Sequence, residues 1–210
     1  MGPRNPGEGR LVAQSILACV LAYNLVFFAQ ELALVLAKAA TPGLHPVLFH
    51  NNHSWTGQHP LVPLLQGAGA VGTMSLGAVC MLWLDRRPPR GQGLRLLALW
   101  MASMGFFEAL PQVVIGGLTP QNDVGMALGF FGLGPRAKGL AAGLAVLACG
   151  AVGRWAAPRF LDLSPFRSTI AAAAGRIAVP LLLLLPLAAP FRTPNAWIEV
   201  ALPPGLDAAV

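Results

Sequence analysis

The sequence predicts an all-α protein, a polytopic bundle of about five transmembrane helices with one short re-entrant or interfacial helix. Only 10% of the 210 residues are charged and 55% are apolar, whereas about 25% of the residues of a soluble domain are charged. The apolar residues form long continuous runs, unlike the ten-residue alternating strands of a membrane barrel. Because backbone groups in lipid must be satisfied within their own segment, such runs favour helices.

Five apolar runs are candidates for these spans. A helix that crosses the hydrocarbon core needs about 20 apolar residues. The runs lie at residues 11–37, 61–84, 96–115, 139–153 and 169–189. The fourth has only 15 residues and spans if the cations of Lys138 and Arg154 reach the head groups. The fifth contains Arg176, and Pro180 and Pro186 predict kinks in it.

Shorter segments complete the predicted domain, which covers residues 1–190. Residues 124–133 are apolar but too few to cross, so we expect a short helix capped by Asn122 or Asp123. Residues 191–210 are expected to lie at the outer interface as a tail. The first run is longer than the 7–15 apolar residues of a signal-peptide core, which favours a retained helix.

The distribution of cations predicts the orientation. If the N-terminus is cytoplasmic and the C-terminus outside, ten Lys and Arg fall in inside segments and four in outside segments. The richness in Ala, Gly and Arg suggests a bacterium and therefore its inner membrane. The expected partners are the lipid bilayer and other membrane subunits. Nucleic acid is not an expected partner, since no aromatic platform accompanies the basic run at residues 86–95, which fits anionic lipid.

Two acids lie inside predicted spans and are the candidate catalytic residues. Ionisable groups within a membrane are costly and usually functional. Glu31 lies near the outer end of the first span, and Glu108 lies in the middle of the third. Asn24, Glu31 and Lys38 share one helix face, because they are seven residues apart. The acids could serve as metal ligands, general bases or proton carriers, or alternatively as hydrogen-bonded packing contacts between helices.

All four histidines fall in a loop that follows the first span, on the side of Glu31. They are His45, His50, His53 and His59. Neutral imidazole is the commonest transition-metal ligand. His50 and His53 could hold a divalent metal such as zinc if Glu31, Glu108 or Asp123 completed the site. The alternative is an interfacial loop whose imidazoles lie at the depth of the head groups.

The cysteines and glycines of the spans indicate packing. Cys19, Cys80 and Cys149 each lie in a different run and behave most simply as small apolar side chains. Small residues let helices approach closely, either within the bundle or between subunits. The glycines concerned are Gly67, Gly69, Gly72, Gly77, Gly139 and Gly143.

Three segments have a distinctive order along the chain. The stretch FFAQELALVLA at residues 27–37 contains Glu31, the run LQGAGAVG at residues 65–72 is rich in small residues, and the run GGLTPQND at residues 116–123 ends in Asp123. In this order they resemble segments of the M50-like, site-2-protease-related, polytopic membrane proteins. In that group, two His of an H-E-x-x-H helix hold zinc and the Glu activates its water.

The resemblance implies roles for particular residues. Glu31 corresponds to the Glu of H-E-x-x-H, and Asp123 corresponds to the later acidic ligand. Both His positions are lost, to Gln30 and Leu34. The resemblance therefore implies a degenerate relative without the standard zinc site.

Three functions remain open from the sequence. The first is a non-catalytic subunit of a membrane complex or a degenerate M50-like relative. The alternative is a metal-dependent intramembrane hydrolase that uses Glu31 with the His45–His59 cluster. A carrier with Glu31 and Glu108 as a relay is disfavoured, because the chain shows no internal repeat.

Overall fold

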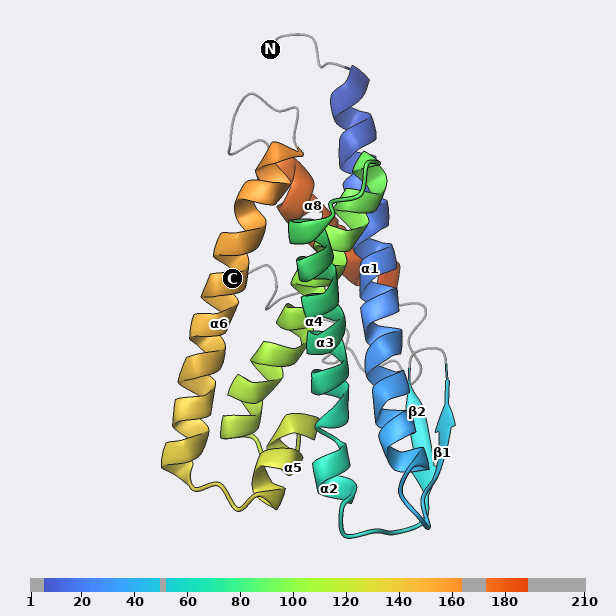
Figure 1. The fold of residues 1–210 in the computed structure, drawn as a ribbon, viewed down its shortest axis with the longest axis vertical. Coiled ribbons are helices and arrows are strands. Elements are labelled where there is room, and N and C mark those ends of the chain that lie inside the picture. Colours follow the sequence, from blue (N-terminus) through green and yellow to red (C-terminus); the bar gives the residue numbers. More distant parts are fainter. Residues whose placement is uncertain (1–5, 50–51, 164–172, 189–210) are drawn as a thin grey trace.

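The computed structural model describes residues 6–49, 52–163 and 173–188 as a bundle of long helices with a small β-hairpin at one end (Figure 1). The helices are α1 (Pro6–Ala39), α2 (Val62–Leu65), α3 (Ala68–Arg86), α4 (Gln92–Leu118), α5 (Asp123–Phe130), α6 (Pro135–Asp162) and α8 (Val179–Ala188). A π-helical turn, η1 (Ala174–Ala178), precedes α8. The hairpin consists of β1 (His45–Leu48) and β2 (His53–Thr56).

Four helical segments within the described residues are long and apolar enough to cross a membrane. They are Gly9–Ala39, Val62–Arg86, Gln92–Leu118 and Pro135–Asp162. Four of the five predicted spans therefore lie on such helices. Of the fifth prediction, residues 169–172 and 189 lie outside the described residues, and the described remainder is helical from Ala174 to Ala188.

The fourth span is longer than the sequence analysis predicted. Helix α6 has 28 residues rather than 15. Its first turns carry Arg136 and Lys138, and its last turns carry Arg154 and Arg159. The charged residues end the apolar run, but they do not end the helix, because Lys and Arg are good helix formers.

Glycines set the closest contacts between the helices. A Cβ added to Gly105 of α4 would lie 2.6 Å from the carbonyl oxygen of Thr73 and 2.7 Å from Cα of Gly77, both in α3. A Cβ on Gly72 would lie 2.6 Å from Cβ of Ala33 in α1. The predicted packing role is thus confirmed for α3. On α6 the glycines face outward, and a Cβ on Gly139 or Gly143 would meet nothing within 4 Å.

The main core joins α1, α4, α6 and α8 around one tryptophan. The ring of Trp100 meets the ring of Phe160 edge-on, with 4.8 Å between centroids. Its indole N–H donates to the hydroxyl of Ser15 in α1 at 3.1 Å, so the polar end of the buried indole is satisfied. The three cysteines, Cys19, Cys80 and Cys149, are buried free thiols, as expected for packing residues.

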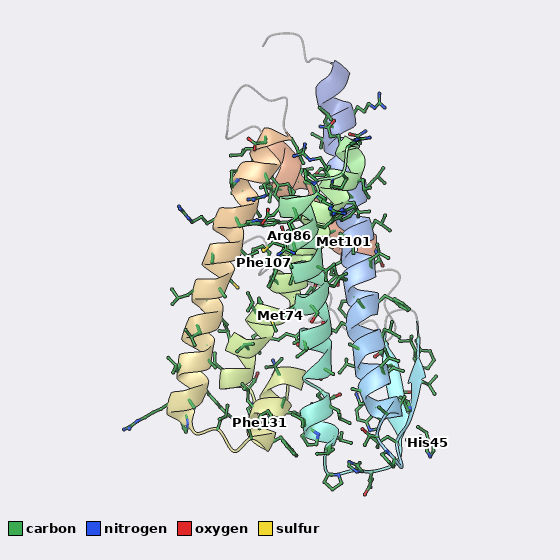
Figure 2. All side chains as sticks on the ribbon, viewed as in Figure 1. His45, Met74, Arg86, Met101, Phe107 and Phe131 are labelled. Carbon is green, nitrogen blue, oxygen red and sulfur yellow. The ribbon has the colours of Figure 1, made fainter. Side chains whose placement is uncertain are left out.

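The two ends of the bundle differ in chemistry. Figure 2 shows Arg86 toward the end of the bundle where α1 begins, and His45 and Phe131 at the opposite end. At the basic end, the guanidinium of Arg159 pairs with Asp85 at 2.7 Å and lies over the ring of Trp155. At the opposite end, the hairpin and α2 contact α1, and α5 packs against α2 and α4 (Figure 1).

Two short elements at this opposite end can be compared with their predictions. The helix predicted at 124–133 is present in part as α5, which ends at Phe130, and Asn122 is its N-cap, since its side chain accepts from the backbone N–H of Gly125 at 2.6 Å. The segment predicted as an interfacial loop instead contains the antiparallel hairpin, in which His45 pairs with Thr56 and Leu48 with His53. The Pro and Asn residues around its short strands had obscured their alternation.

Candidate functional site

The hairpin brings one face of its strands onto the end of α1. Successive side chains of a strand point to opposite faces, and in β2 the side chains of His53 and Trp55 are partly buried whereas Ser54 and Thr56 are exposed. The rings of His53 and Trp55 are stacked, with 5.5 Å between centroids. The strand alternation therefore selects which histidine and which aromatic ring face the helices.

Glu31, His53 and Lys38 form a continuous hydrogen-bonded chain. Nδ1 of His53 lies 2.6 Å from Oε2 of Glu31, and Nε2 of the same ring lies 2.8 Å from Nζ of Lys38. Glu31 and Lys38 are two helical turns apart on α1, and the imidazole bridges them. The predicted helix face that holds Glu31 and Lys38 is thus the face that the hairpin covers.

The geometry assigns the tautomer of His53. A lysine ammonium donates hydrogen bonds and has no lone pair to accept one. Nε2 of His53 therefore accepts from Lys38, and the ring proton lies on Nδ1, where it donates to the carboxylate of Glu31. In many histidine metal sites, one ring nitrogen binds the metal and the other donates to a carboxylate. Here an ammonium takes the place of the metal.

The chain continues from Lys38 toward α5. Nζ of Lys38 donates to Oε1 of Gln66 at 2.6 Å, and the amide nitrogen of Gln66 donates to Oδ1 of Asp123 at 3.1 Å. Gln66 lies at the junction of α2 and α3, and Asp123 begins α5. The hydrogen-bonded chain thus joins α1, the junction of α2 and α3, α5 and the hairpin. We call the six residues Glu31, Lys38, His53, Trp55, Gln66 and Asp123 the polar cluster.

The polar cluster is almost closed to solvent. Lys38 is fully buried, and the indole of Trp55 covers its ammonium with 4.4 Å between Nζ and the ring centroid. Glu31 and Gln66 are 5% and 6% exposed. The carboxylates of Asp123 and Glu31 both attract the charge of Lys38. With one ammonium, two carboxylates and a neutral imidazole, the cluster carries a formal charge of −1.

A second polar chain runs beside the cluster. The amide nitrogen of Gln112 in α4 donates to Oε1 of Gln30 at 3.2 Å, and the amide of Asn122 donates to the backbone carbonyl of Gln112 at 3.1 Å. Gln30 precedes Glu31, and Asn122 precedes Asp123. The two chains together fix α1, α4 and α5 relative to one another.

The structure brings together three of the five predicted site residues. Glu31, His53 and Asp123 belong to the polar cluster. Glu108 is buried in the middle of α4, as expected for an intramembrane acid. His50 lies outside the described residues, so its predicted role stays a prediction.

Two further histidines of the predicted group lie apart from the cluster. His45 is exposed on the outward face of β1. Nδ1 of His59 accepts from the backbone N–H of Leu61 at 3.2 Å, which gives this imidazole a local role at the start of α2.

The sequence analysis missed Lys38, Gln66 and Trp55 as members of the site. One signal was present, because the seven-residue spacing places Lys38 on the face of Glu31. No sequence signal pointed to Gln66, since it is joined to Lys38 across 28 positions by the packing of α2 and α3 against α1. Trp55 required the hairpin, which the sequence did not reveal.

The residues at the H-E-x-x-H position do not fit a zinc ion. Gln30 is hydrogen-bonded to Gln112, and the buried side chain of Leu34 packs against Gly69. The imidazole of the polar cluster, His53, already accepts a hydrogen bond from Lys38 at Nε2. Across residues 6–49, 52–163 and 173–188, no three His, Cys, Asp or Glu side chains are grouped so that they could hold a metal.

The order Lys38, His53 and Glu31 also matches that of a nucleophile, a base and an orienting acid. A nucleophile must reach a substrate, however, and Lys38 has no exposed surface. Its three ammonium hydrogens face His53, Gln66 and the ring of Trp55. The arrangement is therefore suited to holding segments together rather than to attacking a substrate.

The part of the chain that the structure describes is helical, and four of its helical segments are long and apolar enough to cross a membrane. One end of its bundle is closed by a hydrogen-bonded group of charged and polar side chains. Comparisons with family models, with curated proteins and with solved structures gave no match.

Proposed function

We propose that this chain is a polytopic integral membrane protein that acts without catalysis, as a subunit of a membrane complex or as a degenerate relative of the M50-like proteins. The observation that carries the proposal is the buried ammonium of Lys38, which donates to His53 and Gln66 at the centre of the polar cluster. Glu31, one of the two candidate catalytic acids, is joined to this ammonium through His53. The side chains of Glu31, His53 and Lys38 are thus hydrogen-bonded to one another instead of facing a substrate.

Electrostatics supports the absence of a metal from this cluster. A divalent ion beside a buried ammonium would add two positive charges to a region of low dielectric constant. Removing charges from water is costly unless opposite charges compensate them. Because Lys38 already offsets one of the two carboxylates, only one negative charge remains to compensate a metal.

The distribution of polar groups supports placement in the inner membrane with the N-terminus inside. The basic run at residues 86–95 and the Asp85–Arg159 pair lie at one end of the bundle, and the hairpin lies at the other. Cytoplasmic ends of membrane helices are enriched in Lys and Arg. The basic end is therefore the cytoplasmic end, and the polar cluster lies toward the outside.

The outward face of α6 supports a role as a subunit. Gly139, Gly143 and Gly150 share this face, and a Cβ on any of them would meet nothing within 4 Å. Glycine weakens a helix by about 1 kcal/mol relative to alanine. Small residues on a lipid-facing surface are favoured where another helix packs closely against it.

Metal analysis of the detergent-purified full chain tests the non-catalytic proposal. We expect wild type and His53→Ala to carry the same trace amounts of transition metal, and dialysis against EDTA to leave the melting temperature of wild type unchanged. The matched control is His45→Ala, which changes an exposed imidazole of the same hairpin. One metal ion per chain in wild type and in the control, lost from His53→Ala, would refute the proposal.

A second candidate function is a metal-dependent intramembrane hydrolase that uses Glu31 and the His45–His59 cluster. The contact between His53 and Glu31 favours it, since a carboxylate commonly orients a metal-bound imidazole. In that case Lys38 must leave Nε2 of His53 before a metal binds. The metal analysis distinguishes this function from the first.

A further inference from the structure

The ammonium of Lys38 is recognised on three sides. Nε2 of His53 accepts one hydrogen bond at 2.8 Å, and Oε1 of Gln66 accepts another at 2.6 Å. The face of the Trp55 ring covers the third side at 4.4 Å. A primary ammonium has three N–H donors, and an aromatic face attracts a cation when water is excluded.

The acceptors around the ammonium are themselves held in place. The carboxylate of Glu31 accepts from Nδ1 of His53, which keeps the lone pair of Nε2 toward the ammonium. Asp123 accepts from the amide nitrogen of Gln66, which keeps Oε1 toward the ammonium. Both carboxylates thus orient a neutral acceptor and also supply negative charge.

We propose that Glu31, His53, Trp55, Gln66 and Asp123 form a binding site for a primary ammonium group, and that Lys38 is the tethered ligand that occupies it. The proposal rests on the proposed function in one respect, namely that the cluster holds no metal. A soluble primary amine should therefore bind once the side chain of Lys38 is removed. The site selects an ammonium over a metal because two neutral acceptors and an aromatic face surround it.

The Lys38→Ala variant removes Cγ to Nζ and leaves the acceptors in place. Propylammonium has the same atoms as the part removed. 1-Propanol has a similar shape without the charge, and tetramethylammonium has the charge without N–H donors. The three compounds separate the contributions of shape, charge and hydrogen bonding.

Thermal unfolding of the detergent-purified full chain tests the proposal. Lys38→Ala should melt below wild type, and millimolar propylammonium should raise its melting temperature by several degrees. Propylammonium should leave the melting temperature of wild type unchanged. It should also leave that of the Lys38→Ala/His53→Ala double variant unchanged, because that variant lacks one acceptor. If Lys38→Ala cannot be purified alone, purification in propylammonium should yield monodisperse protein.

Several results would overturn the ammonium site. These are no rise with propylammonium, an equal rise with 1-propanol or tetramethylammonium, an equal rise in wild type, or failure to recover the variant in the amine. A larger rise with Zn²⁺ than with propylammonium would make the cluster a metal site instead. The proposed function fails separately, on stoichiometric metal in wild type, whatever Lys38→Ala binds.

Discussion

Nζ of Lys38 lies 2.8 Å from Nε2 of His53, and this contact makes a histidine of the hairpin part of the interior of a helical bundle. It fixes the imidazole with its proton toward Glu31, and together with the bond between His53 and Glu31 it joins the hairpin to α1 at two points. Buried ionic groups add little stability as a set, but removing one member leaves the others without compensation. The polar cluster is therefore expected to respond strongly to single substitutions.

His53→Phe tests the central imidazole. The phenyl ring keeps an aromatic side chain at this position but cannot accept from Lys38 or donate to Glu31, so a loss of about 3 kcal/mol in the free energy of unfolding is expected. Denaturant unfolding in mild detergent measures it. His45→Phe, on the exposed face of the same hairpin, should change stability by less than about 0.5 kcal/mol. Equal losses in both variants would show that His53 has no special role.

Asn122→Ala tests the cap that positions Asp123. The variant loses the bond to the N–H of Gly125 and the bond to the carbonyl of Gln112. A destabilisation of about 1–2 kcal/mol is expected from loss of the cap. Asn24→Ala is the control, because Asn24 is exposed and its amide bonds only to the carbonyl of Val20 in its own helix. The prediction is wrong if the two alanines have the same effect.

Gly105→Ala tests the crossing of α3 and α4. The added methyl would overlap the backbone of Thr73 and Gly77, so the helices must separate at a cost of about 1–3 kcal/mol. Gly143→Ala adds the same methyl to the outward face of α6, where there is space, and should not destabilise the isolated chain. The melting temperatures of both variants, compared with that of wild type, test this difference. A Gly143→Ala variant that melts as early as Gly105→Ala would contradict the arrangement of α6.

Asp85→Asn tests the ion pair at the opposite end. Asp85 and Arg159 are 39% and 36% exposed at their side chains. Water screens such pairs, and the loss should stay below about 1 kcal/mol. The comparison with His53→Phe contrasts a solvated pair with a buried one. If Asp85→Asn and His53→Phe lower the free energy of unfolding equally, solvent exposure does not determine how much each polar group contributes to stability.

The sequence predicted the long helices because their signal is local. A continuous apolar run of about 20 residues has few alternatives in lipid. The length of α6 was underestimated because Lys138 and Arg154 end the apolar run but not the helix. The cap of α5 was foreseen as Asn122 or Asp123, since capping residues precede an apolar helix directly in the sequence.

The site was predicted only in part because its contacts are not local. Glu31 was a candidate from its depth in a span, and His53 and Asp123 were candidates from their ligand chemistry. Their assembly depends on Gln66, which meets Lys38 because α2 and α3 pack against α1, and meets Asp123 because α2 packs against α5. The hairpin also escaped prediction, and without its alternation nothing in the sequence separates His53 from His45.

Cysteine accessibility in intact cells tests the central claim most directly, namely that the polar cluster and the basic run lie at opposite membrane faces. Ser54→Cys places a thiol on the exposed face of β2, and Arg90→Cys places one between α3 and α4. The three native cysteines are buried, so the wild-type chain is the background control. We predict that a membrane-impermeant maleimide labels Ser54→Cys from outside, and labels Arg90→Cys only after permeabilisation. Labelling of both thiols from the same side would contradict this account.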